Sequence, residues 1–405
     1  MAENGTVKPA RKVGQCLERS VGDFAIVIPP GPMKGEDFFA NELQYAVWKL
    51  TGQVMPVRNK SAGADAFEVL VGGGAAQGYF TLATEGNKLV VRANDLFGSM
   101  EAARRLCTVY YGEQYRNNIH AGFCQKLPSY QDFYREKTAA HRVMFHNVWG
   151  TDAPIDGGRS RYAAAYHLAY GADAVCLNEF TGAVARSGVF QAVMEKGGYR
   201  AVPVPEGWLL PVWYRPDRVR LLDCACADFE MLNAAHGATV AVFEETDGAN
   251  RRFMVAGIHL ASAWDCPQVE KYYRHLNNMR VLFRVIGEMA GKWGDVHVVV
   301  GGDCNCRADG ESYREFVRHG YADAFTLAEH GNDRCSCHGY PTYCEALGTF
   351  HADAPASDIP YANSIDHLFV SHADRVRVAL YRVNQETIVP VISDHCPQMA
   401  DFDLL

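Results

Sequence analysis

DVHVVVGGDCNC, residues 295–306, is the stretch of sequence that decides the fold class of this 405-residue chain. Its apolar run is rich in valine and ends in two glycines, followed by Asp303 and Asn305. Such an uninterrupted apolar run is typical of a strand covered on both faces. Further runs of this kind follow residue 140: HRVMFHNVW, ADAVCLNE, LLPVWYR, TVAVFEE, RFMVAGIHL, SIDHLFV and ETIVPVISD. Together they predict strands of a layered α/β sandwich.

Two helices are predicted between these strands. SRYAAAYHLAYGA is the first, and we expect the neighbouring Arg159 to be a solvated helix charge rather than a phosphate contact. PQVEKYYRHLNNMRVLFRVIGEMAGKW is the second, opening at Pro267. Its apolar stripe is predicted to comprise Val269, Tyr273, Leu276, Phe283 and Ile286.

Several of the predicted strands end in polar residues that a buried strand would not use for packing. These residues are Glu179, His259, Asp303, Asn305, Asp394 and His395, and Asn147 and Asp366 lie inside runs of the same kind. Isolated carboxylates at buried strand ends cost several kcal/mol unless a cation or hydrogen bonds compensate them. Carboxylate and amide oxygens favour Mg²⁺ or Mn²⁺ over Zn²⁺. The pattern therefore predicts a divalent-cation site of the kind that phosphoester hydrolysis requires.

The motifs FHNVWG, AVCLNE, GIHL, GGDCNC, GTFH, SIDHLFVS and ISDHCP occur in this order after residue 140. In sequence and spacing they resemble the motif series of the endonuclease/exonuclease/phosphatase superfamily. The resemblance spans residues 141–405 and implies a four-layer α/β sandwich catalytic domain.

The resemblance also implies a metal site and a base. Glu179 would bind the metal, with support from Asn147 and Asp394. Asp303 would orient and deprotonate the attacking water.

Four further residues carry roles by the same resemblance. Asn305 would fix the phosphate, and His259 would be a second phosphate contact. His395 would meet the phosphoryl oxygen or the leaving group, while Asp366 would hold the His395 imidazole in the required tautomer.

The chain departs from the family pattern at three places. Cys304 stands where the family usually has Phe, and strand alternation predicts that its side chain points to the core. Ile258 replaces the usual Thr before the central histidine. Residues 331–361 form a longer segment than the motif spacing demands, and a loop beside an active edge commonly sets substrate choice.

The N-terminal third is predicted to form a smaller α+β domain. We expect an N-terminal arm over residues 1–22, the small domain over 23–119, a connector over 120–140 and the catalytic domain over 141–405. ELQYAVWKLTG, VLVGG and DLFGSMEAARRL resemble the ancillary domain that precedes the barrel of several glycoside hydrolases. That resemblance implies a carbohydrate context and no catalysis of its own.

Composition and charge exclude several classes. With 48% hydrophobic and 21% charged residues, the chain is neither disordered nor collagen-like. Its net charge is −8, and the acidity lies after residue 140. An acidic domain disfavours non-specific binding of nucleic acid, although a local basic groove would still permit it. No membrane span and no secretory signal are seen, so we expect a cytoplasmic protein. The oligomeric state is left open.

Thirteen cysteines without regular spacing indicate reduced thiols rather than a disulfide framework. One group has ligand types suited to a structural Zn²⁺ site: Cys335, Cys337, His338 and Cys344. Reduced loop thiols are the alternative for this group.

We therefore expect a divalent-metal-dependent phosphoesterase that acts on a phosphodiester or phosphomonoester of a small or carbohydrate-linked substrate. An endonuclease or exonuclease acting on DNA or RNA is the alternative within the enzyme class. A non-catalytic protein that binds a phosphorylated ligand or a glycan is the alternative from another class. A decayed site should have lost a key residue, but Glu179, Asp303, Asn305, Asp394 and His395 are all present.

Overall fold

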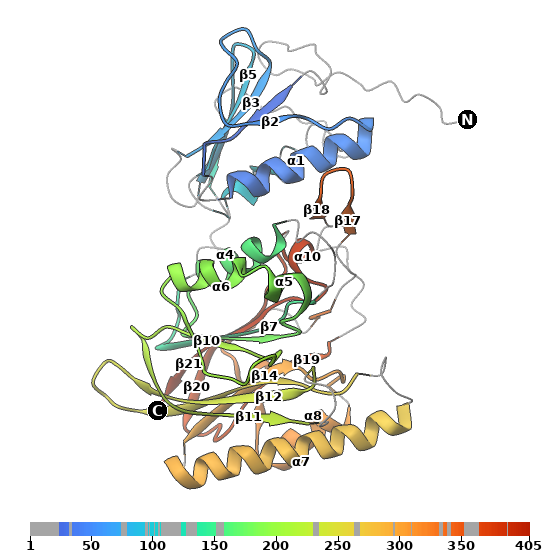
Figure 1. Ribbon diagram of the computed structural model, residues 1–405. Coiled ribbons are helices and arrows are strands. Elements are labelled where there is room, and N and C mark those ends of the chain that lie inside the picture. The colour runs from blue at the N-terminus through green and yellow to red at the C-terminus, as the bar shows by residue number, and fades with distance from the viewer. Residues whose placement is uncertain are drawn as a thin grey trace. The chain divides into compact units, whose positions relative to one another are not determined.

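The structure is a computed structural model whose contacts divide the chain into two units (Figure 1). The first unit comprises residues 1–135 and 342–351, and the second comprises residues 136–341 and 352–405. The residues that the structure describes are 24–31, 35–73, 79–93, 96, 98–100, 102–103, 106, 123–126, 136–150, 158–229, 235–262, 268–294, 296–308, 310–331, 335–337, 342–351, 364–386 and 388–405. The predicted arm over residues 1–22 lies outside the described residues.

The first unit contains a mixed sheet in the order β2-β1-β3-β5-β4-β6. Its strands are β1 (Ala25–Val27), β2 (Val57–Arg58), β3 (Glu68–Gly72), β4 (Tyr79–Glu85), β5 (Lys88–Ala93) and β6 (Phe123–Lys126). Strands β4 and β5 pair antiparallel across the turn at Gly86 and Asn87. Phe123–Lys126 lie in the stretch predicted as a connector, yet they pair with β4 as the last strand of this sheet.

Helix α1 (Glu36–Thr51) packs in the same unit. Phe39, Leu43 and Val47 lie four residues apart on one face of the helix and are fully buried. The helix ends at Gly52, whose φ of 69° is the left-handed conformation typical of a helix C-cap.

A hairpin from far along the chain completes the first unit. It consists of β17 (Thr342–Cys344) and β18 (Thr349–His351). His351 is buried, stacks on the Tyr45 ring of α1 with 4.0 Å between ring centroids, and its Nδ1 lies 2.8 Å from a Glu42 carboxylate oxygen. The long segment predicted over residues 331–361 thus contributes structure to the first unit.

The second unit contains two sheets, as the predicted sandwich requires. One has the order β16-β20-β21-β7-β8-β10-β9, and the other has the order β11-β12-β13-β14-β19-β15. The first of these sheets contains β7 (His141–Asn147), β8 (Ala174–Asn178), β9 (Arg200–Ala201), β10 (Val212–Tyr214), β16 (His330–Gly331), β20 (Val376–Val383) and β21 (Gln398–Leu404). The second contains β11 (Val219–Asp228), β12 (Gly237–Glu245), β13 (Arg252–His259), β14 (His297–Asp303), β15 (Ala322–Asp323) and β19 (Asp366–Val370).

The two sheets pack face to face between two layers of helices (Figure 1). The helices of this unit are α4 (Arg159–Tyr170), α5 (Gly182–Arg186), α6 (Val189–Lys196), α7 (Gln268–Trp293), α8 (Glu311–Arg318), α9 (Ala324–Leu327) and α10 (Val389–Ile392). Gly301 permits the close approach of the sheets, because a Cβ there would lie 2.9 Å from the Phe145 ring of β7. The side chain of Cys304 is buried in the core, as predicted.

A buried ion pair joins β7, which carries the first motif, to β21 at the C-terminal end of the sequence. Arg142 of β7 and Asp401 of β21 lie opposite each other in the ladder. Arg142 donates from Nε at 2.6 Å and from Nη2 at 2.7 Å to the two carboxylate oxygens of Asp401. Both side chains are fully buried, so each charge depends on the other for compensation.

Two expectations about secondary structure are wrong. ETIVPVISD, predicted as a strand, contains helix α10 instead, with Pro390 in its first turn. Proline has no N–H to give to a strand ladder but is well tolerated where a helix begins. Strands β11, β20 and β21 were not among the predicted runs, since charged residues such as Asp223, Arg377 and Asp401 interrupt their apolar pattern.

The predicted stripe of α7 is wrong at its N-terminal end. Val269 is 71% exposed and Tyr273 is 65% exposed. The buried face begins further along the helix, where Met279, Leu282 and Ile286 pack against the sheet. Helical periodicity identifies a face but does not show how far the neighbouring sheet extends. Among the described helices, none is long and apolar enough to cross a membrane.

Candidate active site

Strand pairing brings the predicted polar residues to one edge of the sandwich. Asp303 at the end of β14 lies opposite His259 of parallel β13 and opposite Asp366 of antiparallel β19. In the other sheet, Asn147 at the end of β7 lies opposite Asn178 at the end of β8. The predicted positions at strand ends therefore meet, as the carboxyl ends of parallel strands do in open sheets.

An amide and two carboxylates form the centre of the site. The Nδ2 of Asn147 donates to Glu179 Oε1 at 2.9 Å and to Asp303 Oδ2 at 3.1 Å. His259 Nε2 lies 3.5 Å from Asp303 Oδ2 and 3.8 Å from Glu179 Oε1. His259 Nδ1 donates to the carbonyl oxygen of Ala235 at 2.6 Å, since a carbonyl can only accept. That bond leaves Nε2 facing the carboxylates.

His395 is held by a buried carboxylate on its other side. Its Nδ1 lies 2.8 Å from Asp366 Oδ2, and its Nε2 lies 3.8 Å from Asp303 Oδ2. The hydroxyl of Ser336 donates to the same Asp366 oxygen at 2.7 Å. Asp366 therefore fixes Nδ1 as a protonated nitrogen and leaves Nε2 directed at the site.

Burial and charge shift the pKa values of two neighbouring groups. Burial, reinforced by the charges of Glu179 and Asp303, raises the pKa of Asp394 to about 6. For His395, burial alone would lower the pKa, but the carboxylates of Asp366 and Asp303 outweigh it and raise the pKa well above its usual range. Perturbation of this kind is typical of functional sites.

Asn305 has a different partner from the one its predicted role requires. Its Nδ2 donates to the carbonyl oxygen of Leu260 at 2.9 Å, and its backbone N–H donates to Asp303 Oδ1 at 2.8 Å. In this arrangement Asn305 fixes the orientation of the Asp303 carboxylate. Its contact with a phosphate stays a prediction.

Unusual backbone conformations cluster at the same edge. Trp149, Glu179 and Asn305 all have positive φ, at 46°, 52° and 47°. Gly302 has a φ of 134°, and a Cβ there would lie 2.2 Å from the carbonyl oxygen of Ile258. Strained residues of this kind persist where the surrounding structure over-determines them, and they are common at active sites.

The structure adds supporting residues that the sequence did not identify. Asn178 accepts the Asp303 N–H through its Oδ1 at 3.1 Å. Arg159 was expected to be solvated but is buried, and its Nη1 donates to the carbonyl oxygens of Val148 and Ile392. It thereby joins the chain after β7 to the end of α10. Asn178 belongs to the AVCLNE motif, whereas no sequence pattern marks the burial of Arg159.

The centre fits a divalent cation. Ligand atoms of Glu179, His259 and Asp303 lie within 4.8 Å of one another, and Asn147 contacts both carboxylates. Two carboxylates held this close repel unless a cation lies between them. Glu179 would hold such a cation, and the buried carboxylate of Asp394 lies near enough to interact with Glu179. Asn147 presents its NH₂ group to the two carboxylates and accepts the Trp149 N–H at its Oδ1, so its role as a metal ligand stays a prediction.

The predicted four-ligand zinc site is not assembled from described residues of one unit. Cys335 and Cys337 belong to the second unit, and Cys344 belongs to the first. His338 lies outside the described residues. A structural Zn²⁺ at these four positions stays a prediction.

Comparison with known proteins identifies a family and several structures of the same fold. The model of a family described as Endonuclease/Exonuclease/phosphatase family matches residues 144–395. A solved mannosyl-6-phosphatase of Bacteroides thetaiotaomicron is 14% identical, with a TM-score of 0.52, over 65% of this chain and 100% of that chain. An endonuclease/exonuclease/phosphatase of Bacteroides vulgatus is 19% identical, with a TM-score of 0.50, over 65% of this chain and 99% of that chain. These likenesses confirm the fold. No curated protein matches the chain significantly.

Proposed function

Because the chain belongs to the endonuclease/exonuclease/phosphatase family, which includes phosphatases and nucleases, we propose that it is a divalent-metal-dependent phosphoesterase. Water would attack the phosphorus of a phosphomonoester or phosphodiester. The observation that carries the proposal is the meeting of Glu179, Asp303 and His395 at one edge, each oriented by a buried polar partner. A catalytically idle sandwich has no need of this arrangement.

Asp303 is the group that would take the proton from the attacking water. Its Oδ2 accepts from Asn147 and its Oδ1 accepts from the Asn305 N–H, so the carboxylate is held in one orientation. A divalent cation held by Glu179, with Asn147 and Asp394 in support, would supply neutralisation of the phosphoryl oxygens and a lower pKa for water. Oxygen ligands favour Mg²⁺ or Mn²⁺ in this role.

His395 and His259 would stabilise the negative charge that develops on the phosphoryl group. His395 presents Nε2 while Nδ1 is bound to Asp366, and its raised pKa favours the protonated, donating form. His259 presents Nε2 while Nδ1 is bound to Ala235. Two imidazoles aimed at one place are suited to an anionic oxygen or to a leaving group that needs a proton.

For the substrate we propose a small or carbohydrate-linked phosphoester. The net charge of −8 disfavours a long polyanion. The mannosyl-6-phosphatase among the structural relatives supports including sugar phosphates among the candidates. A nuclease acting on DNA or RNA is the second candidate, and the family itself supports it.

The test is hydrolysis of a panel of phosphoesters with Mg²⁺ or Mn²⁺. The panel comprises a sugar 6-phosphate, an inositol phosphate, p-nitrophenyl phosphate, bis-p-nitrophenyl phosphate, single- and double-stranded DNA, and RNA. We expect turnover that EDTA abolishes and that Asp303→Ala lowers by about 10²–10⁴-fold. Glu288→Ala is the matched control, because that carboxylate is exposed on α7.

The outcomes separate the candidates. Preference for the sugar phosphate supports the proposed substrate class, and preference for DNA or RNA supports the nuclease. Full activity of Asp303→Ala would overturn the assigned base. If the protein binds metal but hydrolyses no substrate of the panel, the result would favour a non-catalytic protein that binds a phosphorylated ligand.

A further inference from the structure

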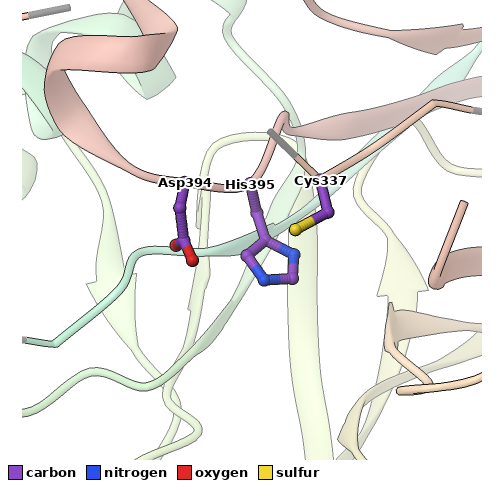
Figure 2. A group of neighbouring side chains, drawn as sticks. All are labelled: Cys337, Asp394 and His395. Atoms are coloured by element: carbon purple, nitrogen blue, oxygen red, sulfur yellow. The ribbon is translucent and has the colours of Figure 1, made fainter. Parts of the chain in front are cut away.

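Cys337 lies beside the proposed catalytic histidine, and the proposed mechanism gives it no role. Its backbone forms an isolated antiparallel bridge with His395, so the two residues are held in register. Figure 2 shows the imidazole of His395 between the carboxylate of Asp394 and the thiol of Cys337. One ligand atom from each of the three residues can be chosen so that all lie within 4.8 Å of one another.

This group differs from the central site in its thiol ligand, and it shares Asp394 with that site. Glu179 and Asp303 of the central site offer hard oxygen ligands, which suit Mg²⁺ or Mn²⁺. A thiolate, an imidazole and one carboxylate suit a softer cation such as Zn²⁺. Three protein ligands with one open position are a common arrangement for zinc, and the spacing here is compatible with it.

Two of the three ligands have surroundings that favour a cation. Asp366 binds Nδ1 of His395, which leaves Nε2 as the nitrogen for a metal and supplies the carboxylate partner that ligating histidines usually have. Asp394 is only 7% exposed, and the hydroxyl of Ser393 lies 3.4 Å from its Oδ1, which is long for a hydrogen bond. A cation would stabilise such a carboxylate.

We propose that Cys337, Asp394 and His395 form a second cation site that prefers Zn²⁺ to Mg²⁺ and inhibits the enzyme when occupied. The predicted inhibition rests on the proposed function. A cation bound to Nε2 of His395 would take the position of the proton that His395 needs to donate to the phosphoryl group. Binding exchanges the thiol proton of Cys337, and the Nε2 proton where His395 is protonated, for the metal, and one proton is released to solvent from each such ligand. Half-burial of Cys337 leaves a path for the ion.

The first experiment measures binding without any substrate. Cd²⁺ is the probe, because Cd²⁺–thiolate charge-transfer absorption in the ultraviolet reports thiol ligation directly. We expect one Cd²⁺ band that Cys337→Ser removes, that Asp394→Asn weakens by at least about tenfold in affinity, and that added Zn²⁺ displaces. Cys224→Ser is the matched control, since Cys224 is also partly exposed but lies on β11.

Cys344→Ser distinguishes the proposed site from the zinc loop expected from the sequence. If the band disappears in both Cys337→Ser and Cys344→Ser but persists in Asp394→Asn, the loop binds the ion and the proposal is overturned. A band that persists in Cys337→Ser also overturns it. Circular dichroism of each variant shows that the fold is retained.

The second experiment measures inhibition with saturating Mg²⁺ and whichever substrate the panel identifies. We expect Cys337→Ser to keep its Mg²⁺-dependent turnover and to need at least about tenfold more Zn²⁺ for half inhibition. Equal Zn²⁺ sensitivity of wild type and Cys337→Ser would overturn the inhibitory role. Failure of the proposed function would leave no turnover to inhibit, whereas the Cd²⁺ measurement would still support or overturn the site.

Discussion

Asp366→Asn should lower turnover strongly while leaving the fold intact. Asp366 Oδ2 accepts from His395 Nδ1 at 2.8 Å and from the Ser336 hydroxyl at 2.7 Å, in a buried place. Asparagine has the same shape, but its NH₂ group cannot accept a hydrogen bond and it carries no charge. The variant also removes one of several buried negative charges, so we expect little loss of stability.

The magnitude follows from the bond that is lost. A hydrogen bond to a charged partner contributes about 1.5–3 kcal/mol. If that free energy holds His395 in the reactive tautomer, its loss lowers kcat by about 10- to 150-fold. KM should change little, because Asp366 acts through His395 and does not touch the substrate.

Steady-state kinetics with Mg²⁺ and the preferred panel substrate is the assay, with thermal unfolding monitored alongside. Ser336→Ala is the matched control, because it removes only the neutral partner of the same carboxylate oxygen. The bond between Asp366 and His395 stays in place in this variant, so it should lose less turnover than Asp366→Asn. Asp366→Asn within twofold of wild type, or Ser336→Ala as impaired as Asp366→Asn, would refute the reasoning.

Three further predictions concern stability, and urea-induced unfolding of the full chain measures each. Gly302→Ala should lower the free energy of unfolding by about 2–6 kcal/mol, because it combines backbone strain at a φ of 134° with a 2.2 Å contact between the new Cβ and the Ile258 carbonyl oxygen. Gly287→Ala on α7 is the control and should be neutral or stabilising, because a Cβ there meets open space. Equal effects of the two substitutions would contradict this account. Asp401→Ala leaves the buried Arg142 guanidinium uncompensated and should cost about 3–5 kcal/mol, so a loss under about 1 kcal/mol would count against it. Burial alone would raise the pKa of Glu68, but hydrogen bonds from the Ala62 N–H, Lys88 and Ser61 lower it to about 2. The stability that this lowered pKa contributes is therefore present above pH 4.5 and is lost as the pH falls toward 2. Glu68→Gln should abolish that pH dependence.

The sequence predicted the sandwich because apolar strands covered on both faces differ clearly from other segments. It predicted the site for a related reason, since polar residues at the ends of such strands are costly unless they meet a partner. Glu179, Asp303 and His395 were identified in this way, and the structure brings them together. The apolar pattern shows only that each polar strand end needs a partner. The register of the strand pairs determines which of these residues meet.

Elsewhere the local pattern was insufficient. IVPVI has the composition of a strand, but Pro390 has no N–H for a strand ladder and is well tolerated in the first turn of a helix. The positions of Ser336 and Cys337 depend on pairing with residues about 30 to 60 positions away, which no local periodicity encodes. Arg159 is buried by tertiary packing against two distant carbonyl groups.

The contact of His351 with Glu42 has a consequence for the order in which the chain can fold during synthesis. The two residues are 309 positions apart, yet both belong to the first unit. At about 5–20 residues per second, a ribosome would need roughly 15–60 s to make the intervening chain. During that time the Tyr45 face of α1 lacks its stacking partner, and most strands of the sandwich are synthesised before the hairpin arrives. The N-terminal unit is therefore the first to begin folding and among the last to be completed.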